Sequence, residues 1–319
     1  MLHYDPKDLS VPDVHRLLLG GVAPRPIALV STISKNGINN LSPFSFFNAF
    51  GANPPIVAFS PSRRGKDASL KDTYNNLMDT KECVIQAVTH SMVEQISLAS
   101  AEFASDVDEF VKSGLTPVNS DIVTPKRVNE SPFQMECKLI EMKSFGEGGG
   151  AANLAICEVL KFHIAEDLFT NGIIDPVKID LVSRMSGNFY SRALMGVFEV
   201  EKPIGKKCIG YDRVPSQIRK SDVYTANDLG KFGNLESIPD ENEVNAFIQK
   251  IINDKFDGFE SGQEAFSRYQ RLNDHKKMLK AAIEMEINKK QNIELAVKTA
   301  LKNNDIDFAW KTAIFATKF

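Results

Sequence analysis

The stretch that most constrains the fold of this chain covers residues 23–48, APRPIALVSTISKNGINNLSPFSFFN. Two prolines at its start favour an extended lead-in, because each proline fixes its own φ and restricts the residue before it. Residues 27–33 are apolar and mostly β-branched, which predicts a buried strand. The Asn-Gly pair at 36–37 predicts a tight type I′ turn, and residues 38–41 return as the partner strand.

The end of this hairpin, residues 42–48, brings hydroxyl groups, an amide and three phenylalanine rings together within seven residues. That mixture suits a flat ligand with one polar edge, because the rings supply apolar walls and the polar groups supply hydrogen bonds. The same residues also fit a core strand followed by an aromatic turn. Both interpretations stay open on composition alone.

A basic segment follows at residues 61–73, PSRRGKDASLKDT, with four cationic side chains, three hydroxyl groups and one glycine. Cations, hydroxyls and free backbone N–H groups near the start of a helix are what a phosphate group needs. The alternative is a solvated loop that ends in a helix N-cap. The segment is therefore a candidate phosphate site.

The rest of the first half alternates short strands with turns. Strands are expected at residues 56–60, 82–88, 133–145 and 153–165, and short helices at 91–100 and 108–112. The glycine run at 146–150 predicts a turn and not a dinucleotide-binding loop, because it lacks the GxGxxG spacing. Strands and helices do not alternate regularly, so a doubly wound parallel sheet is not expected. The pattern predicts a mainly β fold with some α structure, an antiparallel Greek-key-like barrel, closed or split.

The character of the chain changes after Pro239. Asp240 followed three residues later by a glutamate is a helix start, and apolar residues then recur at helical spacing. These are Val244, Phe247, Ile248, Ile251 and Ile252. We therefore expect two parts, a barrel domain over residues 1–239 and a C-terminal helical extension over 240–319. The apolar stripe is expected to be buried against the barrel or against a second subunit.

Composition and charge exclude several function classes. The 319 residues are 43% hydrophobic and 25% charged with a formal charge of -3, which gives no bulk attraction to nucleic acid or to anionic membranes. No apolar run is long enough to span a bilayer, and the first ten residues lack the basic and apolar regions of a secretory signal. We expect a cytoplasmic protein without nucleic-acid or membrane partners.

No metal site is expected from the cysteines and histidines. The chain has four cysteines and five histidines, and neither set shows the spacing of zinc ligands. The cysteines lie mainly in apolar, strand-like runs, which is typical of small buried side chains in a reducing compartment.

Several short motifs follow one another in a fixed order between residues 10 and 235. They are PRPIALVST with the Asn-Gly turn, SFFN at 45–48, KDT at 71–73 with Asn76, EV and FHI within 158–164, and SRMSGNFY at 183–190. Together they resemble the flavin reductase-like family of FMN-binding split barrels. The resemblance does not extend to residues 240–319.

The resemblance implies a homodimer that binds FMN near its subunit interface and reduces it with NADH or NADPH. It implies flavin contacts for Ser45, Phe46, Phe47 and Asn48, phosphate contacts for Lys71, Asp72 and Thr73 with help from Arg63 and Arg64, and a ligand-orienting or dimer contact for Arg184. It places His163 near the flavin and nicotinamide, where an imidazole whose charge changes near neutral pH suits proton chemistry. The hydride chemistry would belong to the cofactors.

The leading hypothesis is an FMN-binding oxidoreductase of the NAD(P)H:flavin reductase type, with a flavin-dependent monooxygenase as one possible electron acceptor. A non-enzymatic FMN electron carrier on the same fold is the first alternative. A flavin-free binding or scaffold protein that assembles through its helices is the second. The sequence carries no fingerprint that separates NADH from NADPH.

Overall fold

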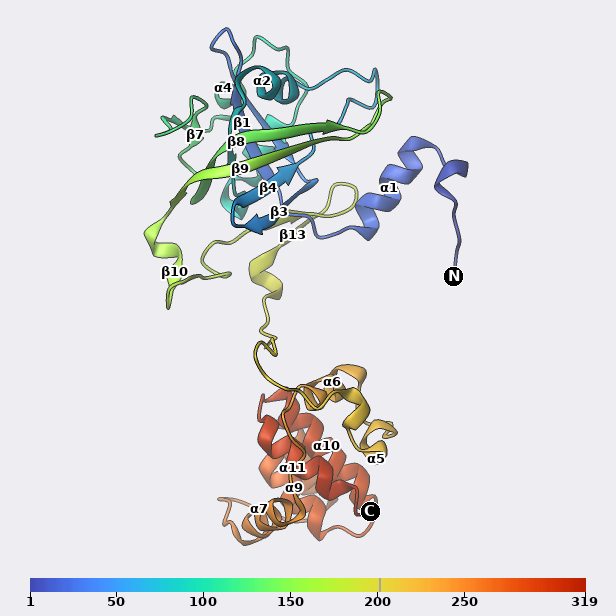
Figure 1. Cartoon of the computed structure of the whole chain (residues 1–319). Coiled ribbons are helices and arrows are strands. Elements are labelled where there is room, and N and C mark those ends of the chain that lie inside the picture. The colour runs from blue at the N-terminus through green and yellow to red at the C-terminus, as the bar shows by residue number, and fades with distance from the viewer. Residues whose placement is uncertain (201) are drawn as a thin grey trace. The chain divides into compact units, whose positions relative to one another are not determined.

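The computed structural model describes residues 1–200 and 202–319, which form two compact units, Met1–Glu199 and Val200–Phe319 (Figure 1). The second unit thus begins earlier than residue 240, where the sequence predicts the boundary. The physical reason is that residues before 240 supply core side chains to the helices. Phe232, for example, stacks on Trp310 with the ring centroids 4.7 Å apart.

The first unit is built on a seven-stranded sheet in the order β2-β1-β5-β8-β9-β4-β3, and every neighbouring pair is antiparallel. The strands are β1 (Ala28–Ile33), β2 (Asn39–Phe44), β3 (Phe47–Ala52), β4 (Pro55–Phe59), β5 (Glu82–Gln86), β8 (Phe133–Ser144) and β9 (Asn153–Ile164). Three small strand pairs lie outside it: β6 (Pro117–Val118) with β7 (Arg127–Val128), β10 (Phe169–Thr170) with β11 (Ile173–Ile174), and β12 (Val182–Arg184) with β13 (Tyr190–Arg192).

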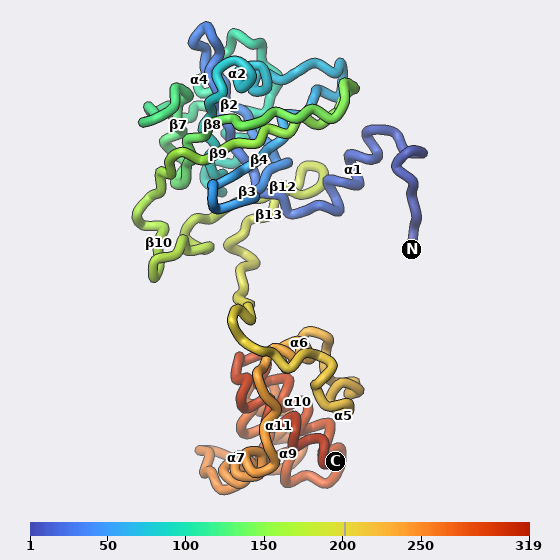
Figure 2. Tube along the Cα trace, in the orientation of Figure 1, coloured from blue at the N-terminus to red at the C-terminus, as the bar shows by residue number. Residues whose placement is uncertain are grey.

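The edges of the large sheet are brought together by the chain itself. Strands β2 and β3 stand at opposite ends of the order, yet only Ser45 and Phe46 separate them in sequence. The sheet must curl until these edges approach each other, which is the geometry of a barrel left open between two strands. The 12-residue strands β8 and β9 run side by side across it (Figure 2). The predicted antiparallel split barrel is confirmed.

The two faces of the barrel wall follow the period of two expected of a strand. Ala28 and Val30 point into the barrel core, which also contains Phe44, Phe59 and the three buried cysteines of the strands. Ile27 and Leu29 point outward into a second cluster that residues of the short helices cover. Because both faces of this strand are buried, residues 27–30 read as one continuous apolar run.

The helices of the first unit are α1 (Val11–Gly21), α2 (Asp72–Thr80), α3 (Val93–Ala99) and α4 (Glu109–Ser113). Single turns of 3-10 helix lie at Pro6–Asp8, His90–Met92, Glu166–Leu168 and Ala193–Gly196. The apolar side chains of α1 are not buried within the unit.

Two local predictions need correction. The β1–β2 hairpin is present, but only the glycine of its Asn-Gly pair has a positive φ, +81° at Gly37. A loop that Ser34 N closes by donating to Ile38 O at 2.9 Å explains this, because three-residue hairpin loops need one left-handed residue at their end. In addition, Phe47–Ala52 forms β3, a strand that the sequence does not predict.

The second unit is entirely helical, with a core of its own. Its helices are a 3-10 turn at Tyr211–Arg213, α5 (Ser216–Arg219), α6 (Ala226–Gly233), α7 (Glu241–Asn253), α8 (Gln263–Arg271), α9 (His275–Glu284), α10 (Lys289–Lys302) and α11 (Ile306–Ala316). The predicted start of α7 is confirmed, since Asp240 and Glu243 form a reciprocal capping box.

The apolar stripe of α7 is covered within this unit, so the expectation that the barrel or a second subunit covers it is wrong. Val244, Ile248 and Ile251 are buried in the helical core. Phe247 contacts Phe308 of α11 edge-to-face, with ring centroids 5.1 Å apart. Ile252 remains exposed. None of the described helices in either unit is long and apolar enough to cross a bilayer.

Candidate functional site

The residues that connect β2 to β3 form the first part of the candidate site. Phe47 pairs with Phe59 and Asn48 with Ala58 in the β3–β4 ladder, and Ser60 N donates to Phe46 O at 2.9 Å. This pairing fixes the backbone of residues 45–48 at the point where β4 leads into the basic segment.

The side chains of residues 45–48 differ in their surroundings. Phe47 is half-buried and packs against the barrel core, whereas Phe46 and Asn48 are exposed. The Phe46 ring contacts His15 of α1 edge-to-face, with centroids 6.2 Å apart. Asn48 accepts a hydrogen bond from the N–H of Ala49 at 2.8 Å, which leaves its side-chain N–H₂ available to a ligand.

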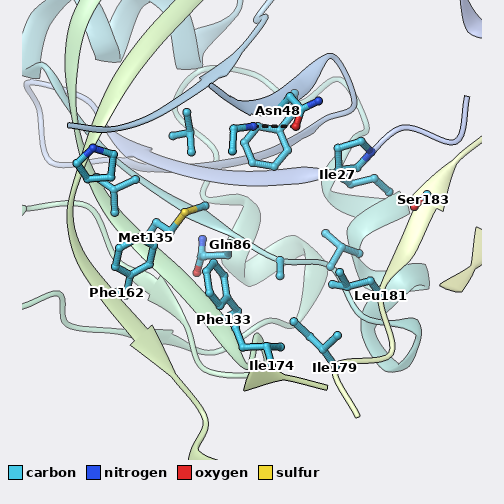
Figure 3. A pocket seen from close by; sticks show the side chains of 18 of the residues that line it. Ile27, Asn48, Gln86, Phe133, Met135, Phe162, Ile174, Ile179, Leu181 and Ser183 are labelled. Carbon is cyan, nitrogen blue, oxygen red and sulfur yellow. Dashed lines mark hydrogen bonds between the residues drawn. The ribbon is translucent and has the colours of Figure 1, made fainter. Parts of the chain in front are cut away.

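A cavity of about 440 Å³ opens beside Asn48, lined almost entirely by carbon. Its lining comes from β3, β4, β8, β9, β11 and β12, from the end of β5, and from the segments that precede β1 and β12. Figure 3 shows Phe133, Met135 and Phe162 on one side and Ile27 and Leu181 on the other. The polar side chains of the lining are Asn48, Gln86 and Ser183. A cavity of this size and character suits a flat, largely apolar ring system with a few fixed hydrogen bonds.

The basic segment is held on the glycine turn between β8 and β9. Arg63 N donates to Ala151 O at 2.9 Å, and Gly150 N donates to Arg63 O at 3.2 Å. The contact is so close that a Cβ on Gly149 would lie 2.6 Å from Gly65 O. The glycine run, which the sequence predicts only as a turn, is therefore the support on which the basic segment rests.

The four cations of this segment are not equivalent. Arg64 folds back on its own loop, donating to Leu70 O at 2.5 Å and to Asp72 at 3.3 Å. Arg63 donates through Nη1 to Ala68 O at 2.8 Å, but its buried Nε has no acceptor among the described residues. Lys66 is exposed to solvent.

Lys71 is the cation best placed to receive an anion. It stands at the N-cap position of α2, is half-buried, and has no carboxylate within 4.0 Å among the residues that the structure describes. Burial and the nearby Arg64 guanidinium lower the pKa of Lys71. An anion beside this ammonium would relieve both effects, because an opposite charge favours the charged form.

Thr73 lies in a buried polar network, and its predicted phosphate contact stays a prediction. Its hydroxyl donates to Asn40 Oδ1 at 2.8 Å, and Asn40 Nδ2 donates to Glu109 at 3.2 Å. Burial raises the pKa of Glu109, against the opposing effect of its hydrogen bonds from Leu41 N and Asn40. The network ties the first turn of α2 to β2 and α4, so Thr73 positions the helix start that carries Lys71.

Arg25 is a site residue that sequence reasoning missed. It is only 4% exposed, yet its guanidinium donates to Leu19 O at 2.7 Å, Val22 O at 2.9 Å and Met185 O at 3.0 Å. Its Nε donates to Ser45 Oγ at 3.3 Å. The signal in the sequence is an arginine between two prolines directly before a buried strand, a pattern that by itself predicts only an extended lead-in.

Arg184 and Arg25 are joined by two backbone hydrogen bonds. Arg25 N donates to Arg184 O at 3.0 Å, and Arg184 N donates to Arg25 O at 2.9 Å. The Arg184 guanidinium lies over the ring of Tyr190, 4.6 Å from its centroid. Burial lowers the pKa of Arg25, and the charge of Arg184 adds to this effect. Two cations and Ser45 thus lie together at one end of the β2–β3 connection.

His163 lies away from the cavity. Its neighbour Phe162 lines the cavity, and successive side chains of a strand point to opposite faces. The imidazole Nε2 lies 2.6 Å from Glu136 Oε1. Its predicted contact with flavin stays a prediction, while the contact with Glu136 supports a structural role.

Glu136 holds a loop through its carboxylate. The buried carboxylate accepts hydrogen bonds from the backbone N–H groups of residues 121–123, at distances of 2.6 to 2.9 Å. Burial alone would raise the pKa of Glu136, but these bonds and His163 prevail and lower it to about 2.

A possible metal site is the cluster of Asp121, Glu136 and His163. The candidate ligand atoms of these residues lie within 4.8 Å of one another. The Glu136 carboxylate already accepts four hydrogen bonds, which uses the acceptor positions a metal would need. Asp121 pairs with Lys161 at 2.5 Å. We therefore assign no metal to this cluster.

Comparison with known proteins bears on the first unit. A family model described as "Flavin reductase like domain" matches residues 20–178. A protein of Halalkalibacterium halodurans is 38% identical over 190 residues, which cover 59% of this chain and 90% of that protein. An Aquifex aeolicus protein is 36% identical and covers 59% of this chain and 93% of its own length. Both relatives are uncharacterised.

Two solved structures share the barrel. Component B of nitrilotriacetate monooxygenase from Bacillus cereus is 33% identical with a TM-score of 0.59, covering 63% of this chain and 98% of that one. A Shewanella frigidimarina protein with a split barrel domain is 25% identical with a TM-score of 0.54, covering 64% and 99%. More than a third of this chain lies outside each match.

Proposed function

The chain belongs to the flavin reductase-like family, and from this premise we propose that it is an oxidoreductase that binds FMN and reduces it with NADH or NADPH. The observation that supports this best is the arrangement along β3 and β4. These strands line the apolar cavity and lead directly into the basic segment with its unmatched donors. An apolar cavity followed by an anion site is what a flavin mononucleotide requires.

The phosphate is proposed to lie on the basic segment. Lys71 has no carboxylate within 4.0 Å among the described residues, and Arg63 has a buried Nε without an acceptor. The backbone N–H groups at the start of α2 add further donors, since Lys71 makes no side-chain cap. Asp72 and Arg64 pair with each other, so their proposed part is to hold the loop rather than to bind the phosphate themselves.

The flavin ring is proposed to lie beside residues 45–48. Asn48 can donate to the polar edge of the ring through its side-chain N–H₂, and Phe47 supplies an apolar wall. Ala58, which pairs with Asn48, is four residues from Ser62, a span of about 13 Å in an extended chain. That span suits a phosphate carried at the end of a ribityl chain. When bound, FMN would accept a hydride from the nicotinamide, while the protein orients the ring and excludes water.

A homodimer is part of the proposal, and exposed apolar side chains support it. Val11, Leu17, Leu18 and Val22 of α1 and its C-terminal end lie in solvent, as does Phe50 beside the cavity. Exposed apolar groups that gather on one element mark interaction surfaces. A second copy that covers α1 would also enclose the Ser45–Asn48 region, which α1 approaches through the His15–Phe46 contact.

The electron acceptor is proposed to be a separate protein or free flavin in the cytoplasm. The Bacillus cereus neighbour is a component of a monooxygenase, and a flavin-dependent monooxygenase is one acceptor that this resemblance suggests. A non-enzymatic FMN electron carrier is the second candidate, because it would need the same flavin site. A cytoplasmic location is consistent with Cys83, Cys137 and Cys157, which are buried and form no disulfide, as is usual in a reducing compartment.

Steady-state oxidation of NADH and NADPH by the purified chain separates these functions. We expect oxidation that depends on added FMN and saturates with its concentration. Visible absorption of bound flavin without any turnover of either nicotinamide would favour the electron carrier. Absence of both flavin binding and turnover would contradict the proposal altogether and leave the scaffold alternative.

A further inference from the structure

A second cavity, of about 430 Å³, lies entirely within the helical unit, and neither the family match nor the proposed function involves it. Helices α6, α8 and α10 and the turn after α8 form its walls. All seven lining residues carry a polar or charged group, and they are Asp228, Lys231, Gln270, Asn273, Lys298, Thr299 and Lys302. Three ammonium groups therefore share one cavity with a single carboxylate.

Each of the three ammonium groups is held in place by an oxygen of the protein. Lys231 Nζ donates to Leu301 O at 2.9 Å, and Lys298 Nζ donates to Val223 O at 2.9 Å. Lys302 Nζ donates to Asn273 Oδ1 at 3.3 Å. An ammonium has three N–H donors, so each lysine keeps two of them for a ligand.

No carboxylate neutralises these lysines. Within the described residues, no Asp or Glu oxygen lies within 4.0 Å of Lys231, Lys298 or Lys302. Asp228 lines the same cavity, but its Oδ2 is occupied by Thr225 N at 2.9 Å and Thr225 Oγ1 at 2.8 Å. Three positive charges and one negative charge leave the lining with a formal excess of two positive charges.

The remaining polar groups complete the recognition surface. Asn273 accepts from Lys302 through Oδ1 and keeps its N–H₂ as a donor, and the side-chain amide of Gln270 makes no hydrogen bond with any of the described residues. Asp228 keeps Oδ1 as a free acceptor. The cavity thus offers many donors for an anion and one acceptor for a hydroxyl group of the same ligand.

We propose that this cavity binds the phosphate monoester of a polyhydroxy compound, such as a sugar phosphate. A phosphate monoester carries a charge near two at neutral pH, which matches the excess positive charge of the lining. Asp228 accepts a hydroxyl hydrogen bond from the sugar. A phosphate group alone fills only part of about 430 Å³, which leaves room for the carbon skeleton.

Helix capping explains only part of this arrangement. Lys231 binds one of the last carbonyls of α10, where a cation is favourable. Lys298 lies within α10 and binds a carbonyl before α6, so it does not serve that helix end. The three positive charges around the cavity repel one another. A dianion bound between them would attract all three and so offset this repulsion.

Calorimetric titration of the full-length chain with ribose 5-phosphate tests the proposal. The protein is first saturated with FMN, so that the proposed flavin phosphate site is occupied. We expect binding of ribose 5-phosphate, weaker binding of inorganic phosphate, and no binding of ribose. Lys298→Ala and Lys302→Ala should each weaken ribose 5-phosphate by about tenfold or more, the usual effect of losing a hydrogen bond between charged groups.

Lys255→Ala is the matched control, because Lys255 is an exposed lysine of the same unit outside the cavity. It should bind ribose 5-phosphate like the wild type, and so should Lys71→Ala in the first unit. Asp228→Asn should weaken ribose 5-phosphate more than inorganic phosphate. Equal affinities in the wild type, Lys298→Ala and Lys302→Ala, with circular dichroism unchanged, would overturn the proposal, as would the absence of binding to the wild type. Neither result would contradict the proposed flavin site in the first unit.

Discussion

Arg25 is the single residue whose contacts join most parts of the candidate site. Its guanidinium links the end of α1, the segment after β12 and Ser45, almost wholly through backbone carbonyl groups. A buried arginine usually pairs with a carboxylate, and none lies within 4.0 Å of Arg25 among the described residues. Its role is therefore to position the surrounding segments.

Replacing Arg25 by methionine should lower the free energy of unfolding by about 3 kcal/mol, because the carbonyls of Leu19, Val22 and Met185 lose their donor. FMN should also bind less tightly, since Ser45 loses its support. Urea denaturation and flavin titration measure the two effects. Arg16→Met, on the exposed face of α1, is the control and should change neither. Unchanged stability of the Arg25 variant would show that these hydrogen bonds do not form in solution.

The pH dependence of stability should reveal Glu136. Its pKa of about 2 in the folded protein lies below the ordinary value of 4.5, so it stabilises the fold above pH 4.5. The contribution, up to about 3 kcal/mol, is lost as the pH falls from about 4.5 to about 2. Glu136→Gln should therefore be less stable than the wild type at pH 7, and the difference should shrink in acid. A difference that is independent of pH would refute this account.

His163→Ala separates a structural role from a catalytic one. Since the imidazole contacts Glu136 and lies on the face of β9 away from the cavity, we expect lower stability and an unchanged rate of flavin reduction. Rapid mixing with NADH or NADPH measures that rate, and urea denaturation measures stability. Slower flavin reduction at unchanged stability would show that His163 takes part in the reaction.

Among the elements, the glycine turn between β8 and β9 decides where the basic segment lies. A methyl group on Gly149 would meet Gly65 O at 2.6 Å, whereas the space beside Gly148 is open. Gly149→Ala should displace the segment and weaken FMN by about tenfold, while Gly148→Ala should bind FMN like the wild type. Fluorescence titration of FMN compares the two variants. Equal binding in both would show that the turn does not position the phosphate site.

Most barrel strands could be predicted because their side chains alternate or form short β-branched runs between turns, as in residues 27–33. Strand β3 could not, since its sequence FNAFGA shows no apolar alternation and its exposure reflects an edge position set by tertiary structure. The basic segment was visible from its composition. Its support by Gly149 and the burial of Arg25 were not, because both depend on contacts between residues far apart in the chain.

In the whole molecule, the boundary between the units was the least predictable feature. The described residues between 202 and 239 form only short helices, and their contribution to the helical core appears only in the structure. Val214, Tyr224 and Phe232 are buried there together with residues of α7 to α11. A unit with its own core is expected to fold by itself.

Two truncations test this division. A chain that ends at residue 199 should stay folded and keep FMN, because the complete barrel and the basic segment lie within it. A chain that ends at residue 239 should aggregate, since Val214 and Phe232 would lose the helices that cover them. Sedimentation and flavin absorbance compare the two. A soluble, monodisperse 1–239 chain beside an unfolded 1–199 chain would place the boundary where the sequence predicted it.

Titration of FMN into the wild type, Lys71→Ala and Lys66→Ala tests the central claim most directly. Lys71 is withdrawn from solvent beside the start of α2, whereas Lys66 is an exposed cation of the same segment. The account predicts that Lys71→Ala weakens FMN by about 1.5–3 kcal/mol and that Lys66→Ala binds like the wild type. Identical dissociation constants for all three proteins, or no FMN binding by the wild type, would contradict it.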